Sequence, residues 1–238
     1  MKNQIIVTGG AGFIGSNLIK KLIKFKKFLI ISIDDYSSGS KKNHIKSPNL
    51  KYIHGHTKDI SKILKKRKKN IQCIFHFGEF ARIFKSFANI NKCFSSNIVG
   101  TSQIFKFCLE NKIKLIYSAT SATLGNAGKD EQLSPYAFTK AKNLELLENL
   151  NKWYGFSYEV IYFYNVYGPG QIKTGSMATV IGIFEHQFKN KLPLTIVRPG
   201  TQKRKFTHVE DTIEVCIDAW RKNKCKHYSI SSKKNYSI

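Results

Sequence analysis

The sequence predicts an α/β protein built on one doubly wound parallel sheet. Apolar runs of strand length alternate with stretches of helical period along most of the 238 residues, as expected for strands joined by covering helices. A glycine-rich turn follows the first apolar run and opens the first helical stretch. A hydrophobic content of 42% is enough for a large buried core.

The alternation places the elements in chain order. Strands are expected at residues 4–8, 28–33, 50–54, 73–77, 114–118 and 156–164, and helices at 13–23, 60–68, 97–110 and 135–153. The composition changes after Pro169, where we expect helices at 178–188 and from 209, and strands at 194–197 and 226–230. We therefore predict a first domain at residues 1–168 and a small lobe at 169–238, interleaved with it. Nothing caps the last segment, so we expect this lobe to be incomplete and the C-terminus truncated.

The glycine turn carries Gly9, Gly12 and Gly15 at three-residue spacing, with Phe13 and Ile14 before the last glycine. In such a turn the first glycine permits the tight bend, the second lets backbone approach a pyrophosphate, and the third lets helix and strand pack closely. The N-terminus of the helix then faces the phosphates. Because strand, turn and helix occur in the required order, the sequence predicts a dinucleotide site here.

Asp34 lies at the end of the second strand, nineteen residues after Gly15. A carboxylate there accepts hydrogen bonds from the adenosine ribose and repels the extra phosphate of NADP, so the predicted cofactor is NAD. Lys41 and Lys42 follow closely in the sequence, and because their positive charges could bind the extra phosphate, NADP is not excluded as the cofactor. The alternative is that Asp34 only caps the strand at a turn.

Tyr136 and Lys140 stand four residues apart at the start of a predicted helix and therefore share one of its faces. Ser134 suits the N-cap and Pro135 the first helical position, which puts Tyr136 in the first turn. The positive end of the helix dipole and the Lys140 ammonium both favour an ionised phenol, which is what a general base requires. The alternative is an ordinary surface helix that carries Tyr and Lys.

The formal net charge of +25 comes mainly from lysines scattered through every segment. Base readout and phosphate forks usually use arginine, so we read this charge as a compositional bias and expect no nucleic-acid partner. A basic nucleic-acid binder on the same scaffold stays as an alternative. His76, inside an apolar strand, is expected to be a hydrogen-bonded core histidine.

The cysteine pattern and the hydropathy point to the cytoplasm. The five cysteines include no Cys-x-x-Cys pair, which predicts reduced, mostly buried thiols and no metal site. No apolar run is long enough to span a bilayer, and no leader segment precedes the first strand, so we expect no membrane association.

Taken in order, these motifs resemble the extended short-chain dehydrogenase/reductase superfamily, and within it the NAD-dependent nucleotide-sugar epimerases of the UDP-glucose 4-epimerase type. The resemblance runs through the whole chain, from the segment Thr8–Asn17, through Asp34, Thr120 and Tyr136-x-x-x-Lys140, to Phe206–Asp211. It implies a Rossmann-type sheet, bound NAD, a UDP-sugar or related nucleotide-sugar substrate, and a homodimer formed through the helices at about 97–110 and 136–153.

The resemblance also implies roles for single residues. Tyr136 would take a proton from a sugar hydroxyl, Lys140 would hold the nicotinamide ribose, and Thr120 would bridge the sugar hydroxyl and the tyrosine. The matching cofactor positions are Gly9, Gly12, Phe13, Ile14, Gly15, Asp34, Phe77, Gly78, Asn97, Ser118, Tyr136, Lys140 and Tyr164. The matching substrate positions are Thr120, Tyr136, Asn165 and Arg204.

Departures from the family pattern qualify the implied reaction. His56 stands where the family has an aspartate that meets the adenine, and Glu79 and Arg82 are unusual residues that could specialise the sugar site. Related dehydratases and decarboxylases carry a carboxylate close to the residue matching Thr120, and here Ser121-Ala122-Thr123 follows. The implied reaction is therefore epimerisation by transient oxidation to a keto sugar. The alternatives are a dehydrogenase or reductase, and a truncated, non-catalytic NAD-binding protein.

Overall fold

A computed structural model describes residues 2–124, 131–175, 177–196, 198, 200–222 and 224–237. Within these residues, seven parallel strands form the central sheet in the order β10-β6-β5-β4-β1-β2-β3. They are β1 (Asn3–Thr8), β2 (Phe28–Asp34), β3 (Leu50–His54), β4 (Ile71–His76), β5 (Lys114–Thr120), β6 (Tyr158–Phe163) and β10 (His227–Ser229). The predicted doubly wound sheet is confirmed, and its strand order reverses between β1 and β4.

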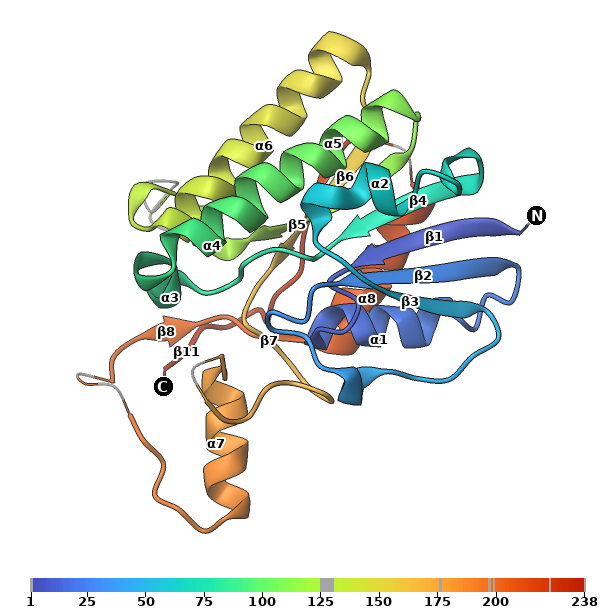
Figure 1. The fold of residues 1–238 in the computed structure, drawn as a ribbon. Helices are drawn as coiled ribbons and strands as arrows, with labels where there is room; N and C mark the ends of the chain where they lie inside the picture. Colours follow the sequence, from blue (N-terminus) through green and yellow to red (C-terminus); the bar gives the residue numbers. More distant parts are fainter. Residues whose placement is uncertain are drawn as a thin grey trace.

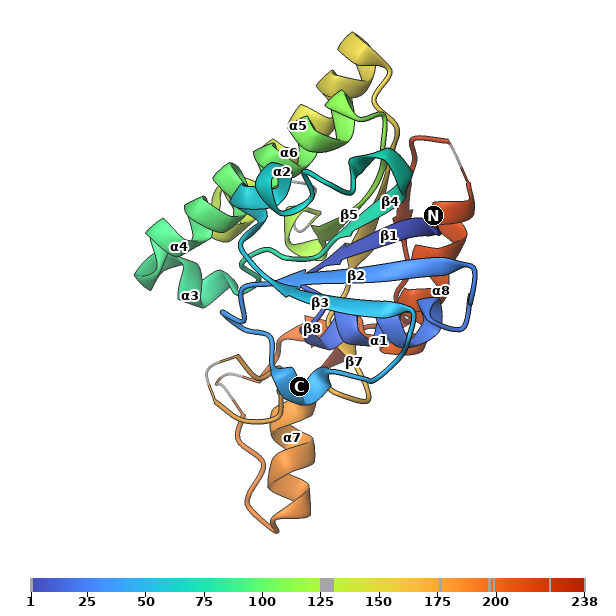
Figure 2. The ribbon, with the colours of Figure 1, turned by 45° about the vertical axis from the view of Figure 1, so that its right-hand side comes forward.

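Helices cover both faces of the sheet (Figures 1 and 2). One face carries α2 (Ile60–Ile63), α5 (Thr101–Glu110) and α6 (Pro135–Tyr154), and the other carries α1 (Phe13–Leu22) and α8 (Val209–Arg221). Two shorter helices, α3 (Ile83–Ala88) and α4 (Ile90–Phe94), lead through a π-helical turn at Ser95–Gly100 into α5. Both faces of the inner strands are therefore buried, which is why Ile5, Ile6 and Val7 form a continuous apolar run and do not alternate with polar residues.

The predicted helix at 60–68 is wrong in its length. The structure has α2 over Ile60–Ile63 only, followed by turns at residues 64–67 and a short 3₁₀ helix at Lys68–Asn70 before β4. Lys62, Lys65, Lys66 and Lys69 would fall three or four residues apart on a continued helix, and like charges at that spacing repel one another.

Residues after 168 are found in two places. The α8 helix packs against α1, and β10 extends the sheet beside β6. In contrast, α7 (Val180–Lys189) projects away from the sheet (Figure 1). Two pairs of short strands lie outside the central sheet. β7 (Val166–Tyr167) pairs with β9 (Thr207–His208), and β8 (Lys203–Arg204) pairs with β11 (Tyr236–Ser237).

The predicted strand at 194–197 is not formed at residues 194–196, and Val197 lies outside the described residues. Leu194 and Ile196 are exposed there. An apolar run becomes a strand only where a neighbouring strand satisfies its backbone groups, and this run has no such neighbour in the described part of the chain.

Two further observations concern membrane-spanning helices and the cysteines. No described helix has both the length and the apolar character needed to cross a membrane. Four of the five cysteines are buried, and Cys225 is partly buried.

Candidate active site

The carboxyl ends of β1, β2 and β4 surround a cleft at the point where the strand order reverses. Gly9 and Gly12 line it from the glycine turn, Asp34 from β2, and residues 77–79 from the segment after β4. His56, which replaces the expected aspartate, lines it as well. Doubly wound sheets bind their ligands at this position.

Two positions of the turn exclude any side chain. Gly9 has φ +70°, and a Cβ on it would lie 2.7 Å from the carbonyl of Phe77. A Cβ on Gly15 would lie 2.2 Å from the carbonyl oxygen of Gly9. The turn therefore bends tightly against the end of β4, and α1 packs directly on the turn.

The N-terminus of α1 fits a phosphate ligand. Its N-cap is Gly12, no side chain caps it, and its first turn contains no acidic residue. The N–H groups of the first turn thus lack a side-chain acceptor, and the helix dipole favours an anion at this end. Phe13 and Ile14 direct their side chains to the core, so their expected contact with a cofactor is through main-chain N–H groups.

Asp34 is buried at the end of β2, with both carboxylate oxygens hydrogen-bonded to the main chain. Oδ2 accepts from the Ala11 N–H at 2.8 Å and Oδ1 from the Tyr36 N–H at 2.8 Å. Burial raises the pKa of Asp34, and these two hydrogen bonds oppose that rise. Through the Tyr36 N–H, Asp34 caps the end of its own strand, as the alternative supposed, and through the Ala11 N–H it also fixes the glycine turn. It lines the cleft as well, as a ribose-binding role requires.

The start of α6 has the predicted local structure. Ser134 is the N-cap, its hydroxyl accepts from the Ala137 N–H at 3.1 Å, and Pro135 opens the helix. Tyr136 follows in the first turn and is only 8% exposed. Its main-chain N–H donates to Ser86 Oγ at 3.2 Å, which ties α6 to α3. The surface-helix alternative does not hold, because this face of the helix is buried.

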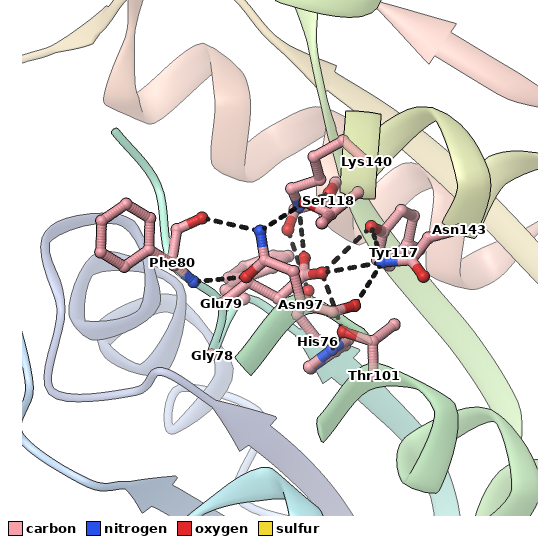
Figure 3. Close-up of polar contacts among 12 residues, drawn as sticks. His76, Gly78, Glu79, Phe80, Asn97, Thr101, Tyr117, Ser118, Lys140 and Asn143 are labelled. Carbon is pink, nitrogen blue, oxygen red and sulfur yellow. Dashed lines mark hydrogen bonds and ion pairs between the residues drawn. The ribbon is translucent and has the colours of Figure 1, made fainter. Parts of the chain in front are cut away.

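Lys140 is the centre of a buried polar cluster at the ends of β4 and β5 (Figure 3). Its ammonium donates to the Ser118 carbonyl and forms an ion pair with Glu79, which is one of the residues lining the cleft. The side chains of Lys140 and Glu79 are 4% and 2% exposed. The lysine is thus one contact away from the cleft wall.

His76 adjoins this cluster and is neutral at physiological pH. It is fully buried in β4, and burial lowers its pKa to about 4. Nδ1 lies 2.7 Å from Thr8 Oγ1, and Nε2 lies 2.9 Å from Thr101 Oγ1. The expectation of a hydrogen-bonded core histidine is confirmed.

Thr120 and Ser118 lie at the end of β5, and both are buried. The Thr120 hydroxyl accepts from the Ala122 N–H at 3.2 Å and begins a 3₁₀ turn at Ser121–Thr123. This contact occupies an acceptor position of the hydroxyl and leaves its hydrogen for another partner. The Ser118 hydroxyl donates to the His76 carbonyl at 3.0 Å, so it connects β5 to β4.

Asn97 fixes the segment that leaves β4. Its amide oxygen accepts from the Phe80 N–H at 2.7 Å, and its amide nitrogen donates to the Phe80 carbonyl at 3.1 Å and to Thr139 Oγ1 at 3.1 Å. The side chain is fully buried in the π-helical turn before α5. Phe77 and Gly78 line the cleft directly, whereas Asn97 acts on it through Phe80.

The expected positions in the C-terminal part lie further along the chain. Tyr164 follows β6 and packs against the core under α5 and α6. Asn165 has φ +38° and donates to the Lys205 carbonyl at 2.8 Å. Arg204 is exposed on β8, and its guanidinium donates to the Lys203 carbonyl and to Gln202 Oε1. The structure thus ties Asn165 to the basic loop formed by residues 200–206, which carries Lys203, Arg204 and Lys205, and leaves Arg204 at the surface.

The main residue that the sequence interpretation missed is Asn143. It lies three residues after Lys140 and seven after Tyr136, so helical spacing alone puts all three on one face. Its amide donates to the Asn97 carbonyl at 2.7 Å and to Glu79 Oε1 at 3.3 Å. Glu79 itself stood out as unusual, but no local pattern links it to Lys140, sixty-one residues away.

Comparison with known proteins places this geometry in a family. The model of the NAD dependent epimerase/dehydratase family matches residues 5–231. A putative UDP-glucose 4-epimerase of Methanocaldococcus jannaschii is 32% identical over 227 residues, covering 91% of this chain and 73% of the relative. An uncharacterised UDP-glucose epimerase of Bacillus subtilis is 29% identical over 231 residues, covering 89% and 70%.

A solved structure gives the same result. The UDP-N-acetylglucosamine 4-epimerase of Methanobrevibacter ruminantium, in complex with UDP-N-acetylmuramic acid, superimposes with a TM-score of 0.89 at 29% identity, over 100% of this chain and 79% of that one. The predicted resemblance is confirmed. The chain belongs to the NAD-dependent epimerase/dehydratase family, and the family's cofactor, NAD, is the one predicted from the glycine turn and Asp34.

Proposed function

We propose that this protein is an NAD-dependent epimerase of a nucleotide-activated sugar, which oxidises one sugar carbon transiently and then reduces it from the other face. The observation that carries the proposal is the position of the Tyr136–Lys140 pair. Both side chains are buried, and Lys140 is ion-paired to Glu79, which lines the cleft beside the glycine turn.

Each residue has a defined task in this proposal. The glycine turn and Asp34 would hold NAD, which would supply a reversible hydride acceptor for the sugar carbon. Tyr136, ionised, takes the proton of the sugar hydroxyl as hydride leaves and gives it back in the second half of the reaction. Lys140 has its ammonium at the end of β5, against the Ser118 carbonyl, and would hold the nicotinamide ribose there. The Thr120 hydroxyl, with its hydrogen not used by the 3₁₀ turn, orients the sugar hydroxyl toward Tyr136.

The carboxylates near the site favour epimerisation over elimination of water. A dehydratase needs a second acid and base to expel water, and none of the described residues 121–124 after Thr120 is acidic. Glu79 is the carboxylate nearest to Lys140, and its two oxygens are fully engaged by donors from Lys140, Thr101, Tyr117 and Asn143. Surrounded by these donors, the carboxylate is ionised and acts only as an acceptor, so it has no proton to give to a leaving group.

For the substrate we propose a UDP-sugar, because the relatives named above are UDP-sugar epimerases. Asn165 and the basic loop that includes Arg204 would meet the diphosphate, for which a guanidinium fork is suited. The test is to incubate the purified protein with UDP-, GDP- and ADP-sugars and to follow the products by NMR. Epimers formed without net NADH support the proposal. Stoichiometric NADH with a released keto sugar would indicate a dehydrogenase, and no turnover of any sugar would leave a non-catalytic NAD-binding protein.

We further propose a homodimer formed through α5 and α6. Apolar side chains are exposed on α6, where Phe138 is 41% and Trp153 61% exposed, and just before α5, where Phe94 at the end of α4 is 39% and Val99 in the π-helical turn 48% exposed. A dimer formed through these helices would cover such side chains. A cytoplasmic location, where the cysteines stay reduced, is part of the same proposal.

The double substitution Phe94→Glu and Val99→Glu is expected to convert the dimer to a monomer, because it places charges in the apolar contact. Light scattering coupled to size-exclusion chromatography measures the mass directly. Phe188→Glu on α7 is the matched control, because Phe188 is also exposed but lies outside the proposed interface. A wild-type monomer, or a dimer that survives the double substitution, would contradict this interface.

A further inference from the structure

Four donors converge on the buried carboxylate of Glu79 (Figure 3). Oε2 pairs with the Lys140 ammonium. Oε1 accepts from the Thr101 hydroxyl at 2.8 Å, the Tyr117 hydroxyl at 3.1 Å and the Asn143 amide at 3.3 Å. Burial, and after it the charge of Glu79, raises the pKa of Tyr117 well above its usual range, so its hydroxyl stays protonated and donates. This is the environment of an ionised carboxylate, which can only accept hydrogen bonds.

A series of hydrogen bonds leads from Thr8 through His76 and Thr101 to Glu79, and each group donates to the next. The series therefore stabilises the ionised form of Glu79. The N–H groups of Phe77 and Gly78 donate to Thr8 Oγ1 at 3.2 and 3.1 Å, so the Thr8 hydroxyl donates to His76 Nδ1. Neutral His76 then donates from Nε2 to Thr101, whose hydroxyl donates to Glu79. Each donor in this series of hydrogen bonds has an acceptor, and the complete series fixes the position of the Glu79 carboxylate.

Glu79 also determines how Lys140 presents its charge. An ammonium has three N–H donors. One is taken by Glu79 and one by the Ser118 carbonyl, and the ammonium lies 4.7 Å from the centre of the Tyr117 ring. Within the described chain no third acceptor is hydrogen-bonded to it. One donor is thus left for a ligand. The negative charge of Glu79 lies beside the ammonium, which is one helical turn from Tyr136 on the same helix face.

We propose that Glu79 is a positioning residue for the epimerase reaction: it orients Lys140 and partly cancels its charge, and it thereby sets the pH range in which Tyr136 can act as a base. This inference rests on the proposed function of Tyr136 and Lys140. It predicts that removing the negative charge of Glu79 favours the ionised phenol, because the lysine charge is then uncompensated.

Other charged groups near Tyr136 are unchanged by a substitution of Glu79. Arg82 precedes α3 and donates to the Met177 carbonyl; burial lowers the pKa of its guanidinium, and the nearby Tyr136 opposes that change. The guanidinium stays charged at physiological pH, so it acts on Tyr136 equally in the wild type and in Glu79→Gln. Burial raises the pKa of the Cys93 thiol on α4, and His76 is neutral. The remaining charged side chains on the helices packed against α6 are exposed or partly exposed and are screened by solvent: Lys85, Lys92, Lys106 and Glu110.

The test replaces Glu79 with glutamine and measures the ionisation of Tyr136 in the cofactor-free protein. Ultraviolet titration of each protein, minus the titration of the same protein carrying Tyr136→Phe, isolates this one phenol. Glu79→Gln is expected to move its ionisation to lower pH by roughly one unit, the size expected for losing one charge in a partly buried site. With the sugar substrate, the acid limb of the pH profile of kcat/KM should move in the same direction.

Glu159 provides a matched control. It is also a buried, ion-paired glutamate, with Lys114 at 3.4 Å, but Lys114 begins β5 and so this pair lies at the opposite end of the sheet from Thr120. Glu159→Gln should lower the melting temperature without moving the ionisation of Tyr136. If Glu79→Gln lowers the melting temperature and leaves that ionisation unchanged, Glu79 has only a structural role and the inference is wrong.

A second comparison applies if Glu79→Gln does not fold. Replacing both charged partners, Glu79→Met with Lys140→Met, removes the pair without leaving one buried charge alone, a change that proteins often tolerate. Tyr136 should ionise at higher pH in Lys140→Met than in the double variant, because only the single variant keeps the negative charge. Equal values would overturn the inference. Because these titrations need no turnover, they are independent of whether the proposed sugar reaction is correct.

Discussion

Replacing Tyr136 with phenylalanine is expected to lower kcat for sugar-nucleotide epimerisation by about 10²–10⁴-fold, the usual contribution of a positioned acid–base group. The fold should persist, because the phenylalanine ring fills the same buried space at the start of α6. NAD affinity should change little, since the glycine turn and Asp34 are untouched. Steady-state kinetics with the substrate identified by NMR measures the first quantity, and calorimetric titration with NAD the second.

Tyr154→Phe is the matched control for this prediction. Tyr154 ends the same helix and is exposed, so removing its hydroxyl tests the substitution without the site. Turnover by Tyr136→Phe within a few-fold of the wild type would move the base to another residue and would end the mechanism proposed above. Loss of NAD binding together with turnover would point to a collapsed site and not to a missing base.

Replacing Asp34 with alanine is expected to weaken NAD binding by about 10- to 100-fold, the usual range for lost hydrogen bonds to a charged group. Part of the loss comes from the turn, because the N–H groups of Ala11 and Tyr36 lose their acceptor. The rest comes from the ribose. Discrimination against NADP should fall as well, because the repelling carboxylate is gone and Lys41 and Lys42 lie nearby.

The ratio of the two dissociation constants separates these causes. A loosened turn weakens NAD and NADP equally, whereas loss of the carboxylate charge narrows the difference between them. Lys41→Ala with Lys42→Ala, added to the Asp34 variant, should restore part of the preference for NAD by removing positive charge near the extra phosphate. An unchanged ratio in Asp34→Ala would mean that Asp34 is only the cap of the turn.

The fold was predictable wherever a pattern is local and repeated. The parallel sheet follows from alternating apolar strands and helices, and the start of α6 from Ser134 and Pro135. The helix predicted at 60–68 is too long, because the helical spacing of its apolar residues does not reveal that its lysines repel one another beyond Ile63. The strand at 194–197 was predicted from an apolar run alone, and the short pairs β7–β9 and β8–β11 were missed because two-residue strands carry no periodic signal.

The candidate site divides in the same way. Tyr136 and Lys140 were found because four residues make one turn of a helix, and the glycine turn because its three glycines are close in sequence. The buried pair of Lys140 with Glu79 could not be found, because it joins the segment after β4 to the second turn of α6. The role of Asn97 was also hidden, since its amide binds Phe80 seventeen residues away.

By itself, the sequence determined the alternation of strands and helices that predicts the sheet, the glycine turn and the Tyr–Lys pair, because each of these patterns lies within a short stretch of chain. Only the tertiary structure decided that Lys140 meets a buried counter-charge and that His76 is neutral and linked to it. The physical reason is that burial and charge compensation depend on which strands lie side by side, and so on which side chains their carboxyl ends bring together. The order of the strands is set by the folding of the whole domain and cannot be read from a short stretch of sequence.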